Sequence, residues 1–239
     1  MPTTYLITGA NRGLGHGLAA SLLLREDHII IGVIRTEETA SALKNLPRHP
    51  TSDLIVLSIP FNAQSISSSE ENYRTAFSTL SKTYPTIDHI DIVIANAGIS
   101  ECHARVLETP AVAVAEHMAV NSIAPLILFQ NTWPLLSVSA NPRFVYVSSM
   151  GGSIHNVPET SKFASLAYGM GKAGGNYLTK KICAENSALS VLSVHPGWIQ
   201  TDLGNGRARA QGFKQAPVTV NTSVEGLLLE VNSAQLEAD

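Results

Sequence analysis

The chain has 239 residues, of which 44% are hydrophobic and 15% are charged, and its formal net charge is −3. This composition is typical of a globular domain with ample core material, and it excludes a disordered or fibrous chain. The charge offers no basic footprint for nucleic acid or an anionic membrane, so we expect neither as a partner.

Short segments of the sequence bear on the cellular compartment, on metal binding and on membrane insertion. The amino terminus, Met1 to Tyr5, lacks the basic start and long apolar run of a signal peptide, which predicts a cytoplasmic protein. Cys102 and Cys183 lie far apart without metal spacing, so we expect plain thiols and no metal site. The apolar segment 111–140 contains polar residues and prolines that would be costly in lipid, and we expect a buried or subunit-facing helix there.

Runs rich in β-branched residues alternate with segments of helical length. The strands are nearly continuous in apolar character, as in parallel sheets that are covered on both faces. The pattern predicts one α/β domain over residues 1–239, a Rossmann-type doubly wound parallel sheet in a three-layer α/β/α sandwich. The predicted strands are 5–8, 28–34, 54–59, 92–95, 144–148 and 191–195, and the predicted helices are 14–25, 37–45, 64–84, 109–136, 165–187 and 221–231.

A glycine-rich turn, Thr8 to Gly15, joins the first predicted strand to the first helix. Gly9 can adopt backbone angles closed to other residues, Gly13 lets the main chain approach a pyrophosphate, and Gly15 allows close helix packing. Free N–H groups and the positive end of the helix dipole would then face the anion. Such a turn is weak evidence alone, but its place in an α/β pattern predicts dinucleotide binding.

The end of the second strand bears on the choice of dinucleotide. An NAD-binding chain would carry an acidic residue there for the ribose 2′-hydroxyl, whereas this chain has Arg35 and Thr36. Arg35 can pair with a 2′-phosphate, Thr36 can add a hydroxyl contact, and Arg12 can supply a second positive charge. The alternative is that both arginines are solvated surface residues. We favour NADP(H) as the cofactor.

Two later segments suggest a catalytic group. Tyr168 and Lys172 lie four residues apart on a predicted helix and therefore on one face, so the ammonium can approach the phenol oxygen. A positive neighbour favours the phenolate that a general acid/base must form. Ser149 supplies a hydroxyl at the end of the fifth strand. Asn121 lies in an otherwise apolar helix, where its amide requires a polar partner.

Taken together, these pieces resemble the short-chain dehydrogenase/reductase family of the classical type over nearly the whole chain. The motifs occur in the family's order: Thr8 to Gly15, Asn96-Ala97-Gly98, Asn121, Ser149, Tyr168-Gly-Met-Gly-Lys172 and Pro196 to Thr201. The amino-acid sequence of residues 5–15 and 93–98 looks most like that of the carbonyl-reductase-like branch. This branch includes norsolorinic acid ketoreductases of fungal polyketide pathways.

The resemblance implies roles for these residues. Tyr168 would exchange a proton with the substrate oxygen that Ser149 orients, Lys172 would hold the nicotinamide ribose, and Asn121 would anchor a water that links Lys172 to solvent. The implied cofactor-binding residues are Gly9, Asn11, Arg12, Gly13, Leu14, Gly15, Arg35, Thr36, Asn96, Ala97, Gly98, Tyr168, Lys172, Pro196, Gly197, Trp198, Ile199 and Thr201.

The chain also departs from the family pattern. Ala95 replaces the first Asn of Asn-Asn-Ala-Gly, and Pro60 or Asn62 stands near the customary Asp that touches adenine. The interval from Ser149 to Tyr168 is long, which leaves Ser153 as a competing catalytic hydroxyl. The family's last strand is missing after the helix at 221–231, so we expect an exposed sheet edge.

The substrate should lie beyond the carboxyl ends of the strands. We expect residues 99–105 and two variable loops, about 150–167 and 198–217, to form the walls, with apolar candidates Met150, Ile154, Val157, Trp198 and Phe213. His103 and His155 could reach the pocket but are more typical of solvent-facing loop residues. Arg207, Arg209 and Lys214 could bind a substrate carboxylate, yet they suit a solvated, mobile lid better.

The sequence thus predicts an NADPH-dependent oxidoreductase that reduces a hydrophobic ketone or aldehyde, including polyketide-type carbonyls, to an alcohol. The competing hypothesis is a regulatory or scaffold module that binds NADP(H) without redox turnover. The small-molecule carbonyl or alcohol is the expected partner, and the apolar helices at 111–136 and 165–187 favour a homodimer or homotetramer.

Overall fold

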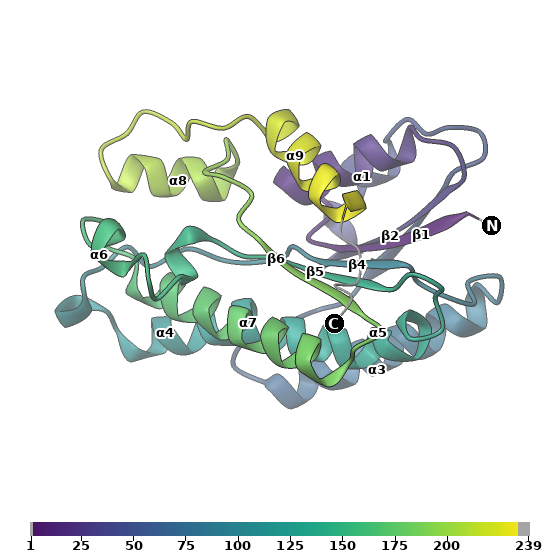
Figure 1. The fold of residues 1–239 in the computed structure, drawn as a ribbon, viewed down its shortest axis with the longest axis horizontal. Helices are drawn as coiled ribbons and strands as arrows, with labels where there is room; N and C mark the ends of the chain where they lie inside the picture. Colours follow the sequence, from purple (N-terminus) through teal and green to yellow (C-terminus); the bar gives the residue numbers. More distant parts are fainter. Residues whose placement is uncertain (1, 234–239) are drawn as a thin grey trace.

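The computed structural model describes residues 2–233 and contains one sheet of six parallel strands between two layers of helices (Figure 1). The strand order is β3-β2-β1-β4-β5-β6. Because the order reverses beside β1, the sheet is doubly wound, as predicted. The strands are β1 (Thr3–Thr8), β2 (His28–Ile34), β3 (Asp53–Ser58), β4 (Ile92–Ala95), β5 (Arg143–Val147) and β6 (Ser190–Val194).

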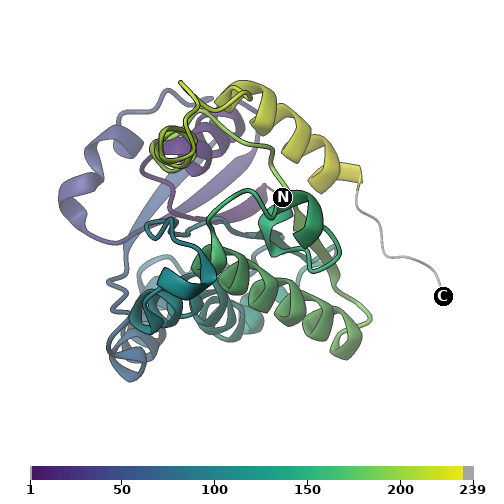
Figure 2. The same cartoon turned by 90° about the vertical axis from the view of Figure 1, so that its left-hand side faces the viewer.

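Helices cover both faces of the sheet (Figure 1). One layer contains α1 (Gly13–Leu23), α2 (Ser41–Lys44) and α9 (Val220–Ser233), and the other contains α3 (Ile66–Thr83), α4 (Ala111–Met118), α5 (Ala124–Leu136) and α7 (Leu166–Glu185). Two further helices, α6 (Val157–Thr160) and α8 (Asp202–Ala210), lie toward the viewer in Figure 2, at the carboxyl ends of the strands. The four-residue α2 is the short remnant of the helix predicted at 37–45, which begins with the 3-10 turn η1 (Glu37–Thr39).

The core has two parts, one on each face of the sheet. Ile7 packs in the cluster that includes Leu18 of α1, whereas its neighbour Leu6 packs in the cluster that includes Phe144 and Leu80. Both Ile7 and Leu6 are fully buried. Since side chains along a strand alternate between faces, burial on both faces explains why the strands read as continuous apolar runs.

The predicted helix 109–136 begins at Ala111 and is not regular. A π-helical turn, η3 (Ala119–Ile123), separates α4 from α5 and contains Asn121. Within residues 2–233, the run Ala111–Leu136 is long and apolar enough to cross a membrane, and 39% of its most apolar window is buried. It packs against α3 and α7, and core helices of globular proteins pass the same test.

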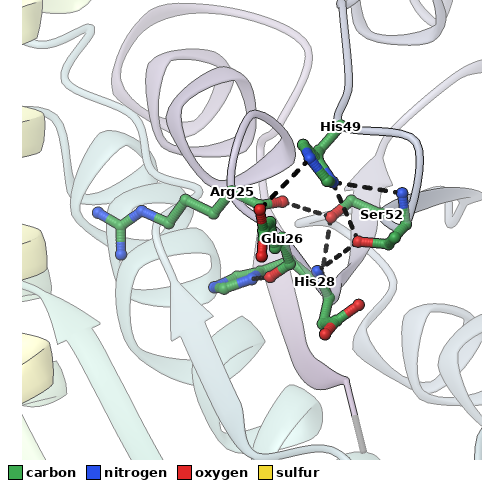
Figure 3. A network of polar contacts seen from close by, with 7 residues as sticks. Arg25, Glu26, His28, His49 and Ser52 are labelled. Atoms are coloured by element: carbon green, nitrogen blue, oxygen red, sulfur yellow. Dashed lines mark hydrogen bonds and ion pairs between the residues drawn. The ribbon is translucent and has the colours of Figure 1, made fainter.

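The two sides of the sheet are held in different ways. At the start of β2, Ser52 Oγ donates to the Arg25 carbonyl (2.5 Å) and accepts from the His28 N–H (3.0 Å), and these contacts lie in the polar network of Figure 3. They hold the turn after α1, where Asp27 has a φ of 55°, against the segment before β3. In the described part of the chain β6 forms the other sheet edge and is only partly buried, as expected.

Candidate active site

A cavity of about 930 Å³ lies at the carboxyl ends of the strands, between the sheet and helix α8. It is lined by the segments that follow each of the six strands. Every residue predicted to bind the cofactor lines this cavity except Gly15. The structure therefore brings together motifs that are spread over nearly 200 residues of sequence.

Gly15 acts through packing. A Cβ at this position would lie 2.6 Å from Asn96 Nδ2 and would press on the Gly9 carbonyl, so only glycine lets α1 start this close to β1. Gly9 and Gly13 have φ angles of 67° and 56°, which other residues rarely adopt. Arg12, the residue before α1, makes no side-chain cap, which leaves the first N–H groups of the helix free for an anion. This cradle fits the pyrophosphate of a dinucleotide.

The rim of the cavity beyond β2 carries positive charge. Arg35 and Thr36 are exposed and line the cavity, as do Pro60 and Asn62 at the end of β3. Arg12 is 67% exposed and lies 3.8 Å from Asp202. Both arginines are thus solvated, as the alternative interpretation held, while they also border the cavity where a 2′-phosphate would lie.

The turn after β4 is tied to β1 by Thr8. Its Oγ1 accepts hydrogen bonds from the N–H groups of Asn96 and Ala97, both at 3.0 Å, and the Asn96 amide donates to the Thr8 carbonyl at 2.7 Å. Thr8 was named in the sequence only as part of the glycine turn. Its hydroxyl has the further task of fixing the loop on the other side of the cradle.

Ser149 and Tyr168 both line the cavity. Ser149 lies two residues after the end of β5 and caps the following turn, η4 (Met150–Gly152), by accepting the Gly151 N–H at 3.1 Å. The competing Ser153 is not among the lining residues within the described chain, and its Oγ accepts the Asn156 N–H at 3.3 Å. The geometry favours Ser149 as the hydroxyl that reaches a ligand.

Lys172 lies one turn after Tyr168 on α7 and is almost fully buried. Its Nζ donates to the Val147 carbonyl at 2.7 Å and lies 4.8 Å from the Tyr146 ring centre and 5.9 Å from that of Tyr168. Burial, and secondly the charge of Arg207, lower the pKa of Lys172 to about 7. The lysine is thus held beside the tyrosine in an environment that disfavours its charge.

Asn121 has the polar partner that the sequence required. Its Oδ1 accepts the Ile99 N–H at 2.9 Å and its Nδ2 donates to the Ile99 carbonyl at 3.0 Å, while its own carbonyl accepts from Tyr146 Oη at 2.7 Å. The amide therefore fixes the loop after β4. Asn121 does not line the cavity, and its predicted role with a water stays a prediction.

The segment after β6 forms the wall nearest α8. Thr201 caps α8 by accepting the Gly204 N–H at 3.1 Å, and its methyl group would lie 3.1 Å from a Cβ at Gly13. Trp198 donates to the Gly204 carbonyl at 2.9 Å and packs edge-on to Phe163 and Phe213. The two variable loops are thus joined through one aromatic cluster.

Parts of the substrate prediction were wrong. Ile154 and Val157 are 82% and 55% exposed, and neither they nor Phe213 line the cavity. His103 and His155 do not line it either, and for these two the preferred interpretation was that they lie outside the pocket. Met150 and Trp198 do line it. Segment 198–217 contains the helix α8, which is followed by exposed Lys214 and carries exposed Arg209.

Arg207 is the site residue whose position differs most from the prediction made from the sequence. It is turned inward and its guanidinium carbon lies 4.3 Å from the centre of the Tyr168 ring. No signal in the sequence separates Arg207 from the exposed Arg209, because both lie in the same glycine-rich segment. That composition predicts a solvated lid, and the inward position of Arg207 corrects this prediction.

Comparison with known proteins decides the family. The model of the short chain dehydrogenase family matches residues 3–212. The chain belongs to this family. This short-chain dehydrogenase is 37% identical to norsolorinic acid ketoreductase nor1 of Dothistroma septosporum, over 98% of its length and 86% of the relative's. It is 36% identical to norsolorinic acid ketoreductase stcE of Emericella nidulans, over 97% and 86% of the two chains.

Solved structures agree on the fold of this short-chain dehydrogenase. An NADPH-bound carbonyl reductase from chicken fatty liver superposes with a TM-score of 0.82, at 24% identity, covering 99% of this chain and 94% of that one. The likeness extends the family fold over the entire sheet.

The lowered pKa of Lys172 predicts how stability depends on pH. Between about pH 7 and 10.5 the unfolded chain binds a proton at this lysine that the folded chain does not, so Lys172 makes the free energy of unfolding rise with pH. Lys172→Met removes this contribution. We expect urea unfolding to show the wild type gaining stability relative to the variant from about pH 7 to about pH 9. Lys180→Met, at an exposed lysine of α7, is the control, and parallel wild-type and Lys172→Met profiles would contradict the prediction.

Proposed function

We propose that this chain is an NADPH-dependent reductase that converts a hydrophobic ketone or aldehyde, of polyketide type, into an alcohol. The observation that carries the proposal is the placement of Tyr168 and Lys172 on consecutive turns of α7, in the same cavity as the dinucleotide cradle. The names of the ketoreductases that share over a third of its residues support the substrate class.

The residues that would hold the cofactor come from four loops and from helix α7. The free N–H groups at the start of α1 suit the pyrophosphate, Arg35 and Arg12 suit a 2′-phosphate, and Lys172 suits the nicotinamide ribose. The bound cofactor supplies the hydride. The protein positions the carbonyl and manages the proton.

Tyr168 gives its phenol proton to the carbonyl oxygen, and Ser149 donates a hydrogen bond to the same oxygen and orients it. The positive charge of Lys172 stabilises the phenolate that remains on Tyr168. Trp198 and Phe163 line the cavity and offer apolar surface to the substrate.

No structural feature favours the alternative of a regulatory or scaffold module without turnover. The Tyr168, Ser149 and Lys172 groups share one cavity with the cradle, which a binding module does not require. The first experiment below separates the two hypotheses.

Tyr168→Phe removes the proton donor and retains the ring. We expect NADPH oxidation with a panel of aromatic ketones to fall by a factor of about 10² to 10⁴, the usual contribution of general acid catalysis. NADPH binding, measured by fluorescence titration, should remain. Tyr177→Phe is the matched control, because Tyr177 lies on the same helix and is exposed. Full turnover in Tyr168→Phe would overturn the mechanism, and NADPH binding without turnover in the wild type would favour the module.

Arg35→Asp tests the choice of cofactor. Reversing this charge at the cavity rim should raise the KM for NADPH by roughly 10- to 100-fold, the loss expected for a hydrogen bond to a charged group. The KM for NADH should change little or fall. Arg74→Asp, on the exposed face of α3, controls for the change in net charge. Equal KM values for the two cofactors in the wild type would argue against the role of Arg35.

We also propose that the chain forms a homodimer or homotetramer. Large apolar side chains are exposed on α4, α5 and α7, namely Val112, Leu126, Met170 and Tyr177. Such residues are typical of subunit interfaces. Light scattering should give two or four times the monomer mass of 25.5 kDa, and a monomer at micromolar concentration would contradict the proposal. The cytoplasmic location stays a prediction.

A further inference from the structure

Helix α8 brings Arg207 into the cavity beside the proposed proton donor. The guanidinium carbon lies 4.3 Å from the centre of the Tyr168 ring, and Arg207 lines the cavity together with Tyr168 and Ser149. A permanent positive charge and the reacting phenol therefore face the same space.

Arg207 finds no counter-charge in the part of the chain that the structure describes. Its Nε is buried without a hydrogen-bond partner, and no ion pair among residues 2–233 includes it. Withdrawing a guanidinium nitrogen from water without a partner is unfavourable. The two terminal nitrogens are not among the buried atoms and form no hydrogen bond within residues 2–233, so a negative or strongly accepting ligand oxygen can reach them.

The groups around Arg207 are basic as well. Its charge is a secondary cause, after burial, of the lowered pKa values of Lys172, His195 and His103. The acidic residue at the start of the same helix, Asp202, faces Arg12 instead. Glu101 and Glu116 line the same cavity but form no ion pair with Arg207 within residues 2–233, so its positive charge is left to attract an anion.

Gln211 extends the polar surface by one helical turn. It lines the same cavity, and both atoms of its side-chain amide are buried without a partner in the described chain. It follows Arg207 by four positions, at the C-terminal cap of α8, so the two side chains lie on one face. The amide can donate and accept, which complements the donors of the guanidinium.

We propose that Arg207, assisted by Gln211, binds an anionic oxygen of the carbonyl substrate, either a carboxylate or an ionised phenol. The planar guanidinium fork matches such oxygens, and the aromatic rings of Trp198 and Phe163 line the cavity where an aromatic body would pack. Arg207 is thus a specificity-determining residue. The inference rests on the proposed function and names the chemical class of its substrate.

The test compares acidic ketones with their neutral counterparts. The carboxylate arm uses para-acetylbenzoate and its methyl ester, and the phenol arm uses para-hydroxyacetophenone and para-methoxyacetophenone. In the wild type we expect a lower KM for the acidic member of at least one pair. Arg207→Gln should raise that KM by about 10- to 100-fold and change the KM of the neutral member less than about threefold. The KM for NADPH should not change.

Arg209→Gln is the matched control, since this arginine lies two residues further on α8 and is exposed. Arg207→Lys keeps the charge without the fork, and it should retain part of the preference. Quenching of tryptophan fluorescence by para-acetylbenzoate provides a binding readout that does not depend on turnover, because Trp198 lines the cavity.

Two results would overturn the inference and leave the reductase function intact. In the first, the wild-type enzyme has the lower KM for the neutral member of both pairs. This result does not depend on whether any variant folds. The second is an Arg207→Gln enzyme whose KM rises equally for acidic and neutral ketones, or rises for NADPH, which would assign the residue to the cofactor. Turnover of none of the ketones, with acid-dependent quenching still present, would instead reject the function and keep the anion site.

Discussion

The position of the reacting groups depends on how closely α7 approaches β5 and η3. A Cβ at Gly171 would lie 2.7 Å from the His117 carbonyl oxygen, and one at Gly175 would overlap the Tyr146 ring. Because these positions lack side chains, the helix lies near enough for Lys172 to reach the last carbonyl of β5. Tyr168 then projects one turn earlier, beyond the end of the sheet and into the cavity. The glycines on this face of α7 therefore set the distance between the helix and its neighbours, and the hydrogen bonds act within that distance.

The close packing of α7 against the sheet also explains the electrostatic character of the site. It buries the Lys172 ammonium among aromatic rings and main-chain carbonyls, where its charge is disfavoured, and α8 adds Arg207 from the opposite wall. A cavity that is lined by Arg12, Arg35, Lys172 and Arg207 and by a cradle of free N–H groups suits ligands that carry negative charge. A phosphate-bearing cofactor and an acidic substrate would each neutralise a different part of it. Trp198 and Phe163 add apolar surface to the same cavity.

Sequence reasoning succeeded where residues are dictated by backbone geometry or by burial on two faces. The strands were found because residues such as Leu6 and Ile7 are buried on opposite faces, and the cradle was found because Gly9 and Gly15 admit no substitute. It failed in the variable loops, which have no period to read. Whether Arg207 faces the cavity depends on how α8 packs, through Gly204 and Ala208, against the rest of the fold. The family motifs predicted correctly that Asn121 lies in a helix, but no neighbouring residue indicated that the turn around it is π-helical.

That π turn bears on how the chain can change over evolution. A π-helical turn holds one residue more than an α-helical turn. The wider turn takes up that extra residue, so loss of one residue between Ala119 and Ile123 would let ordinary α-helical hydrogen bonds form while α5 keeps Ile127 and Leu128 in the core. The change would fall on the turn itself, which holds Asn121 against Ile99. A deletion in this segment therefore acts on the loop after β4 and not on the core, while the loops around α6 and α8 remain free to vary in length and so to explore new substrates.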